Sequence, residues 1–190
     1  MKRNSSFLLF LFVLVSGCAN DSAILTKIET IQSAPIDLCI SEMMKIDKDG
    51  SIKSKENNHK APFRMVVYTS HKECSTCALN NLSEWSVLFD LEKDNKLEFV
   101  FILCPEKRNI NHVVDTYLSS GLEHAVYIDT CGIFTQKNPN IPEEAIYHTL
   151  LLDSDRNAVL VGNPLKNPQI QTLFENILKD IGEPKNKKRQ

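Results

Sequence analysis

The stretch RMVVYTSHKECSTC, residues 64–77, joins a strand-like run to a pair of cysteines. Residues 64–69 are rich in β-branched and apolar side chains and follow Pro62, which predicts a β-strand. A short polar turn leads to Cys74 and Cys77. The apolar residues after the pair recur at helical spacing, at Ala78, Leu82, Trp85 and Phe89. The stretch therefore predicts a strand, a turn and then a helix over residues 77–90, with the cysteines where that helix begins.

The rest of the chain continues this alternation of strands and helices. The run LEFVFIL, residues 97–103, is nearly all apolar and suits a central strand covered on both faces. Residues 131–144 contain two prolines and predict an irregular segment. Further strands are predicted over residues 124–129, 149–152 and 158–161, and further helices over 110–120, between Asn109 and Gly121, and over 169–181, before Gly182.

This order of elements predicts an α/β fold. A strand–helix–strand start requires two parallel strands with a right-handed crossover, and the closing hairpin makes the sheet mixed, with helices on both faces. The chain has 190 residues, of which 42% are hydrophobic, and a formal net charge of -2. One globular domain fits this length. The near-neutral charge excludes nucleic acid as an expected partner, because binding to phosphates requires a basic surface.

The first residues have the pattern of an export signal. Lys2 and Arg3 precede the apolar run FLLFLFVLV, residues 7–15, which is too short to span a bilayer. The small residues that follow end at Cys18, and this arrangement resembles the bacterial lipobox. We therefore expect a signal peptide over residues 1–17 and a lipid on Cys18 that tethers the protein to a membrane. The expected organisation continues with a tether and N-terminal extension over 18–60, containing a small hairpin, a folded domain over 61–182 and a basic, disordered tail over 183–190.

Export places the cysteines in an oxidising compartment. The chain has six, and with Cys18 lipidated an odd number remains, so at least one is unpaired or reactive. At the start of a helix, free backbone N–H groups and the helix dipole stabilise a thiolate. Cys74 is therefore the predicted nucleophile. Cys77 lies one helical turn further on, where it could attack a mixed disulfide on Cys74 and resolve it.

The order of elements and the CxxC motif together resemble the thioredoxin-like family, especially its membrane-tethered, periplasm-facing thiol–disulfide oxidoreductases. The resemblance covers residues 61–181 and implies a three-layer sandwich with a central mixed sheet. It also implies that Cys74 is the nucleophile and Cys77 the resolving thiol. The implied partners are protein dithiols or disulfides and a redox protein at the membrane, since one CxxC must be regenerated by another protein. No cofactor is expected.

Three positions depart from the family pattern. Tyr147, His148 and Thr149 stand where the family has a cis-proline before the hairpin strand, so His148 and Thr149 are candidates for substrate docking. The charge of His148 could also tune the Cys74 thiolate. Glu73 stands where the family often has tryptophan, and its carboxylate should raise the pKa of Cys74. Tyr68 replaces an acidic residue that helps to deprotonate the resolving thiol, which leaves no identifiable buried base.

Other interpretations of the cysteines stay open. Cys104 and Cys131 could complete a zinc site with the CxxC pair, although no second CxxC is present and no metal is expected. They could instead form a structural disulfide, or be inert thiols. Cys39 has no evident partner. The sequence does not support a peroxiredoxin-type peroxidase, because the proline and threonine that precede the reactive cysteine in such enzymes are missing before Cys74. The alternative to an enzyme is a binding lipoprotein of the same fold whose CxxC disulfide is only structural.

Overall fold

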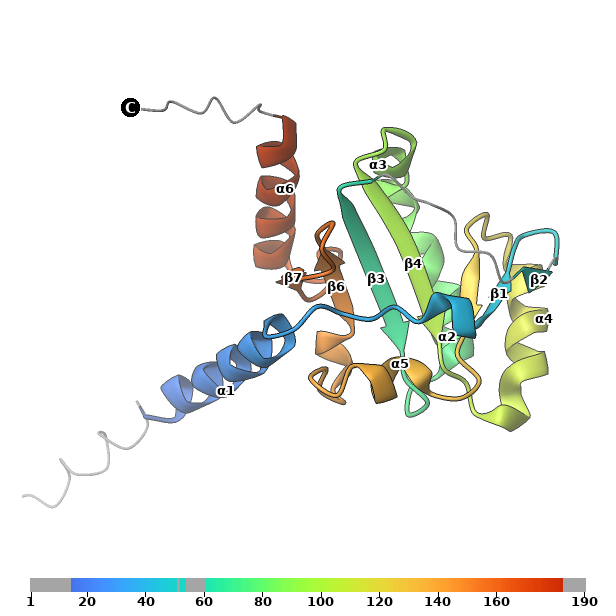
Figure 1. Ribbon diagram of the computed structural model, residues 1–190, viewed down its shortest axis with the longest axis horizontal. Coiled ribbons are helices and arrows are strands. Elements are labelled where there is room, and N and C mark those ends of the chain that lie inside the picture. The colour runs from blue at the N-terminus through green and yellow to red at the C-terminus, as the bar shows by residue number, and fades with distance from the viewer. Residues whose placement is uncertain (1–14, 51, 54–60, 183–190) are drawn as a thin grey trace, which may run out of the picture.

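The computed structural model describes residues 15–50, 52–53 and 61–182 (Figure 1). Most of the expected signal segment, 1–17, and the expected basic tail, 183–190, lie outside these residues. Lipid attachment at Cys18 stays a prediction. No helix in the described part of the chain is long and apolar enough to cross a membrane.

A seven-stranded mixed sheet in the described residues forms the centre of the molecule, in the order β2-β1-β5-β4-β3-β6-β7. β3, β4 and β5 run parallel to one another, and the remaining neighbours pair antiparallel. The expected mixed α/β sheet is therefore confirmed. The strands are β1 Met44–Ile46, β2 Ile52–Lys53, β3 Phe63–Thr69, β4 Leu97–Leu103, β5 Val126–Ile128, β6 Thr149–Leu152 and β7 Ala158–Val161.

The helices depart from the sequence prediction at three places. The first is the helix Val15–Gln32, which lies where the end of the signal segment and the tether were expected. The helix expected over residues 77–90 is divided into α2, η2 and α3, and Ser83 Oγ donates to the Asn80 carbonyl at 3.3 Å where the first piece ends. The segment 131–144, expected to be irregular, contains α5. The α-helices are α1 Val15–Gln32, α2 Ser75–Leu82, α3 Asp90–Lys93, α4 Ile110–Ser120, α5 Ile133–Lys137 and α6 Pro168–Gly182. The 3-10 helices are η1 Ile40–Glu42, η2 Ser83–Leu88, η3 Lys107–Asn109 and η4 Ala145–Tyr147.

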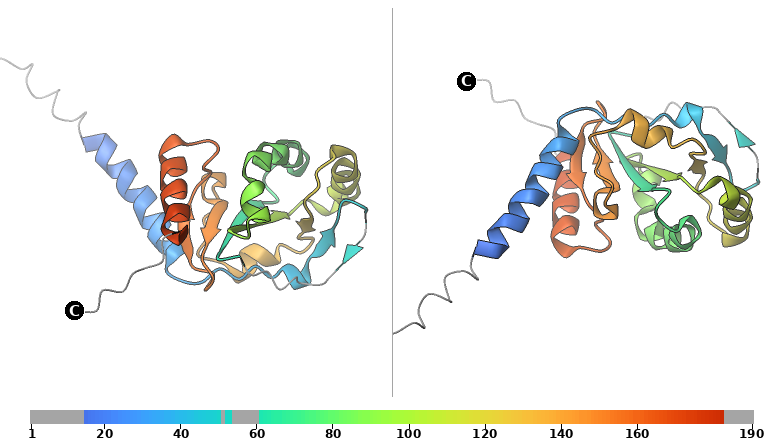
Figure 2. Two further views of the ribbon diagram at one scale, coloured as in Figure 1. Left: turned by 90° about the horizontal axis from the view of Figure 1, so that it is seen from above. Right: turned by 90° about the horizontal axis from the view of Figure 1, so that it is seen from below.

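Each face of the sheet has its own hydrophobic core, because successive side chains of a strand point to opposite faces. Met65 of β3 and Phe101 of β4 belong to one core, with residues of α2, α4 and α6. Val66 and Ile102 belong to the other, with residues of η4 and Phe134 of α5. The molecule therefore has three layers, with helices on both sides of the sheet (Figure 2).

The segment between α1 and β1 completes the second core. α5 has only five residues, so it covers little of that face of the sheet. The remaining cover comes from buried apolar side chains before residue 44, which are Ile31, Ile36, Leu38, Ile40 and Met43. β1 then pairs with β5, and β1 and β2 form the expected small hairpin, with Lys45 opposite Lys53. The folded unit thus begins well before residue 61, whereas the sequence placed these residues in the tether and extension.

Replacing Ile36 by alanine should lower the free energy of unfolding by about 2–4 kcal/mol, because its fully buried side chain fills the core that the short α5 leaves uncovered. Urea unfolding checks this value. Leu25→Ala is the control, since Leu25 is 59% exposed and its replacement should change stability by less than about 0.5 kcal/mol. Equal effects of the two substitutions would show that residues 31–43 do not stabilise the domain.

Candidate functional site

The cysteine pair lies between β3 and α2, as the sequence predicts. Cys74 is the N-cap residue of α2, and its sulfur forms a disulfide with that of Cys77 across a Cα–Cα distance of 5.2 Å. The backbone N–H of Cys77 points at Cys74 Sγ, 3.2 Å away. An N–H directed at sulfur from the first turn of a helix would stabilise the negative charge of a Cys74 thiolate after reduction.

Both sulfurs belong to exposed residues, so an incoming thiol can reach the disulfide from solvent. The exposure of the two cysteines therefore does not show which one is the nucleophile and which one is the resolving thiol. Two contacts do distinguish Cys74: its sulfur faces the Cys77 N–H, and it lies 3.4 Å from Thr76 Oγ1, a further potential donor. These contacts favour Cys74 as the better-stabilised thiolate, and the two roles stay predictions.

A buried histidine contacts the residue before Cys74. His148 is 3% exposed, and its Nδ1 lies 2.8 Å from Glu73 Oε2 while its Nε2 lies 3.0 Å from the Pro142 carbonyl oxygen. The same Glu73 oxygen accepts the backbone N–H of Ser70 at 2.9 Å. These bonds join the turn that carries Cys74 to the loop that precedes β6.

The contacts of His148 indicate which ring nitrogen carries hydrogen. A carbonyl oxygen can only accept, so Nε2 must carry hydrogen to bond Pro142. The bond between Nδ1 and the carboxyl group then needs a second hydrogen, on either partner. The Glu73 carboxyl group and the His148 ring are therefore joined through one shared hydrogen. The expected effect of Glu73 on the pKa of Cys74 stays a prediction.

His148 and Thr149 occupy the expected position in front of the hairpin strand. Both are buried, and they line a cavity of about 190 Å³ together with Glu73, Ala78 and Trp85. No peptide bond in the described residues is cis, so the chain enters β6 without the family's cis-proline turn. Their role in docking a substrate stays a prediction, but the structure does place both residues on the same cavity as the turn before Cys74.

Tyr68 cannot serve as the missing general base. Its side chain is 3% exposed, and its ring lies 4.7 Å from that of Phe134 and 5.0 Å from that of His148. Burial raises the pKa of Tyr68, and the nearby Cys104 and Asp129 raise it further. The phenol therefore stays protonated at neutral pH.

Of the alternatives for Cys104 and Cys131, the structural disulfide is not formed, because both are free thiols. Cys104 is buried at the end of β4, where burial and then the charge of Asp129 raise its pKa, whereas Cys131 is exposed before α5. Cys39 is also free, and burial followed by the charge of Asp37 raises its pKa to about 12. Cys39 and Cys104 are therefore protonated and poorly reactive at neutral pH.

The described residues also provide no set of ligands for the alternative zinc site. Two of its four thiolates are joined in the disulfide, and the other two differ in burial. No group of three or more histidine, cysteine or acidic side chains in residues 15–50, 52–53 and 61–182 is placed to hold a metal ion.

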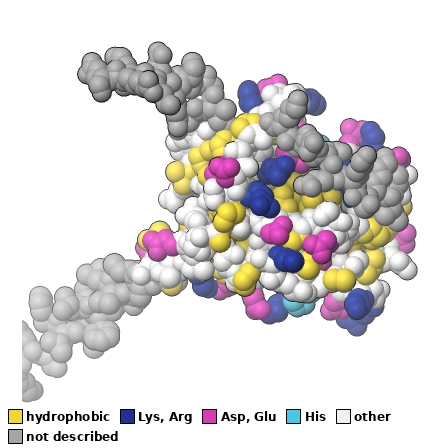
Figure 3. All heavy atoms as spheres, in the orientation of Figure 1, with side chains coloured by type: hydrophobic (Ala, Val, Ile, Leu, Met, Phe, Trp, Pro, Cys, Tyr) yellow, Lys and Arg dark blue, Asp and Glu magenta, His cyan; other side chains and the backbone are white. Residues whose placement is uncertain are grey.

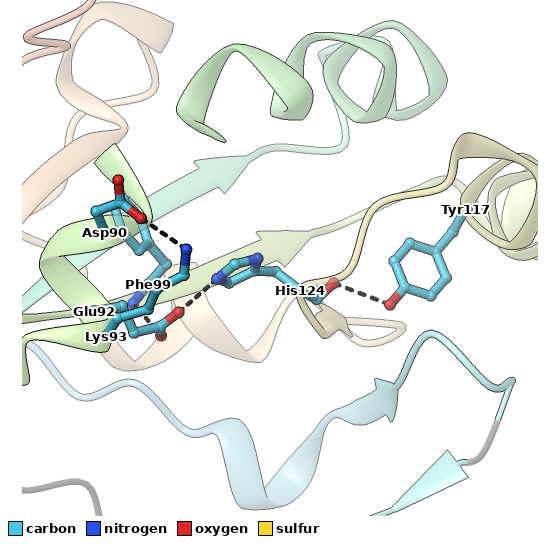
Figure 4. A network of polar contacts seen from close by, with 6 residues as sticks. All are labelled: Asp90, Glu92, Lys93, Phe99, Tyr117 and His124. Atoms are coloured by element: carbon cyan, nitrogen blue, oxygen red, sulfur yellow. Dashed lines mark hydrogen bonds and ion pairs between the residues drawn. The ribbon is translucent and has the colours of Figure 1, made fainter. Parts of the chain in front are cut away.

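A second polar network lies around α3 (Figure 4). His124 Nε2 bonds Glu92 Oε2 at 2.5 Å, and its ring stacks on Phe89 at 3.6 Å between centroids. The hydroxyl of Tyr117 donates to the His124 carbonyl oxygen at 2.9 Å. The network ties α3 and α4 to the loop before β5. Sequence analysis did not identify it, because its members are separated in the chain.

No protein-family model and no curated protein matches the sequence. Solved structures with a similar fold include an uncharacterized thioredoxin-like protein from Porphyromonas gingivalis, 17% identical with a TM-score of 0.47 over 72% of this chain and 86% of that chain. A putative protein disulfide isomerase from Bacteroides thetaiotaomicron is 17% identical, with a TM-score of 0.44 over 74% and 84%. The reduced 2-Cys peroxiredoxin of Plasmodium vivax is 15% identical, with a TM-score of 0.48 over 76% and 83%. At these low identities, the case for a function rests on the chain's own residues.

Replacing Glu73 by alanine should lower the free energy of unfolding of the oxidised protein by about 1–3 kcal/mol, because the Ser70 N–H and His148 lose their acceptor. Glu73→Gln should cost less, since the amide oxygen can still accept from the Ser70 N–H. Urea unfolding compares both variants with Glu143→Ala, which removes an exposed ion pair with Lys72 and should cost about 0–1 kcal/mol. Equal losses for the two alanine variants would show that Glu73 contributes no more than a surface charge.

Proposed function

We propose that this chain is a thiol–disulfide oxidoreductase of the bacterial cell envelope. The observation that carries the proposal is the accessible Cys74–Cys77 disulfide at the start of α2, with the Cys77 N–H directed at Cys74 Sγ. A bridge that only stabilises the fold does not need exposed sulfurs or a position where a thiolate is stabilised. The thioredoxin-like arrangement around the pair supports the same chemistry.

The exchange proceeds in two balanced steps. The Cys74 thiolate of the reduced protein attacks one sulfur of a substrate disulfide, which breaks the substrate S–S bond and releases one thiol after protonation. Cys77 then attacks Cys74 Sγ in the mixed disulfide, releases the second substrate thiol and closes the Cys74–Cys77 bond. Two electrons and two protons pass from the protein dithiol to the substrate. The reverse sequence oxidises a substrate dithiol, starting from the oxidised form described above.

The cellular setting is part of the proposal. The signal pattern in residues 1–17 supports export and a lipid on Cys18, which would hold the domain at a membrane facing the periplasm. A tethered domain with one CxxC pair exchanges electrons with protein thiols and must be regenerated by a redox protein of that membrane. Nucleic acid is not a proposed partner, because acidic and basic side chains are interspersed on the face shown in Figure 3 and the net charge is near neutral.

Cys74→Ser should abolish catalysed reduction of a peptide disulfide by dithiothreitol, leaving only the rate of dithiothreitol itself, because the attacking sulfur is gone. Reduced Cys77→Ser, freed of dithiothreitol and then mixed with the peptide disulfide, should accumulate a mixed disulfide between Cys74 and the peptide, which mass spectrometry detects. Cys131→Ser is the matched control, since Cys131 is exposed but lies outside the pair, and it should leave the rate unchanged. Full activity in both Cys74→Ser and Cys77→Ser would refute the proposal and favour a binding protein with a structural disulfide.

A further inference from the structure

His148 is a buried polar side chain that takes no part in the two exchange steps. It lies directly before β6, and both of its ring nitrogens are bonded, Nδ1 to Glu73 Oε2 and Nε2 to the Pro142 carbonyl oxygen. Its backbone is bonded as well, because its N–H donates to the Ala145 carbonyl oxygen and its own carbonyl oxygen accepts the Tyr68 N–H. These four bonds fix the orientation of the ring, with Nδ1 directed at Glu73.

The Glu73 carboxyl group is held from a second side by the turn that contains it. Its Oε2 accepts the Ser70 N–H, and the Glu73 backbone N–H donates to the Ser70 carbonyl oxygen at 3.0 Å, so residues 70–73 close on themselves. The bond to His148 then joins this turn to the loop before β6. The Glu73 side chain is only 30% exposed as a result. Its carboxyl group therefore has a defined place directly before Cys74.

Glu73 is the acidic group best placed to act on a Cys74 thiolate. The two residues are adjacent in the chain and line the same cavity of about 290 Å³. Water screens an exposed charge more strongly than a partly buried one. Negative charge on Glu73 should therefore raise the free energy of the thiolate more than charge on the exposed groups around it. The other ionisable side chains that line this cavity are all exposed, and they are His71, Lys72, Glu106 and His112.

The bond with His148 reduces this effect of Glu73. Because Nε2 donates to Pro142, Nδ1 either donates a second ring hydrogen to the carboxylate or accepts one from a carboxylic acid. In the first case the carboxylate is paired in a charge-assisted hydrogen bond, and in the second it carries no charge. In both cases Cys74 has less negative charge beside it than a free carboxylate would supply.

We propose that His148 is a positioning residue of the exchange reaction and acts through Glu73. By holding the Glu73 carboxyl group in a hydrogen bond, it limits the repulsion between that group and a Cys74 thiolate. It thereby stabilises the reduced form of the cysteine pair relative to the disulfide. The inference rests on the proposed function, and this role of His148 requires no contact with the substrate.

The equilibrium of the Cys74–Cys77 pair with glutathione tests this role, because it compares the reduced and oxidised forms of one full-length protein. Two amide variants separate the ring nitrogens, since the amide nitrogen of asparagine lies near the place of Nδ1 and that of glutamine near the place of Nε2. His148→Asn keeps a donor to Glu73 and should leave the equilibrium constant within about twofold. His148→Gln loses this donor and should favour the disulfide by about three- to tenfold.

Variants of Glu73 show whether His148 acts through this residue. Glu73→Asp keeps the charge but is one methylene shorter, so its carboxylate should not reach Nδ1, and it should favour the disulfide as His148→Gln does. Glu73→Gln removes the charge, and in this background His148→Gln should have no further effect on the equilibrium. His124→Asn is the matched control, because it breaks another histidine–glutamate bond, to Glu92, that lies outside the site.

The outcomes separate this inference from the proposed function. An unchanged equilibrium in His148→Gln, or a shift that persists in the Glu73→Gln background, would overturn the inference and leave the oxidoreductase intact. If urea unfolding shows that His148→Gln does not fold, Glu73→Asp decides in the same way by the presence or absence of its shift. A pair that does not exchange with glutathione in the unsubstituted protein would overturn both.

Discussion

The parallel register of β3 and β4, from Phe63 opposite Leu97 to Thr69 opposite Leu103, brings the ends of both strands to one edge of the sheet. β3 leads into α2 at this edge, so the positive end of α2 lies at the Cys74 sulfur. The apolar residues of the two strands alternate between the two cores. The burial that stabilises the domain therefore also fixes the position of the disulfide.

The turn before Cys74 is held by a contact between distant parts of the chain. Glu73 and His148 are 75 residues apart, and their bond joins the disulfide turn to the loop in front of β6. The backbone of that loop also supports β3, because the Tyr68 N–H donates to the His148 carbonyl oxygen at 2.9 Å. The N–H of Cys77 and the dipole of α2 act on Cys74, while the neighbouring Glu73 carboxyl group is bonded to His148 and Ser70.

Local sequence patterns predict those parts of the structure that depend on neighbouring residues. The apolar runs at residues 64–69 and 97–103 predicted the bounds of β3 and β4 to within one residue. The position of the cysteine pair predicted where α2 begins. Features that depend on tertiary packing were missed or misplaced. The buried apolar residues between positions 31 and 43 carry no strong local pattern, and they pack in the same core as Phe134 of α5. Likewise, no spacing rule links Glu73 to His148, or places Cys104 in the core and Cys131 at the surface.

The reduction potential of the Cys74–Cys77 pair tests the central claim most directly. The full-length protein is equilibrated with glutathione buffers of defined potential, and the oxidised fraction of the pair is measured by peptide mapping. A reversible couple between about -270 and -120 mV is predicted, because proteins that exchange disulfides lie in this range. A pair that stays oxidised below about -300 mV would contradict the account and identify a structural bridge.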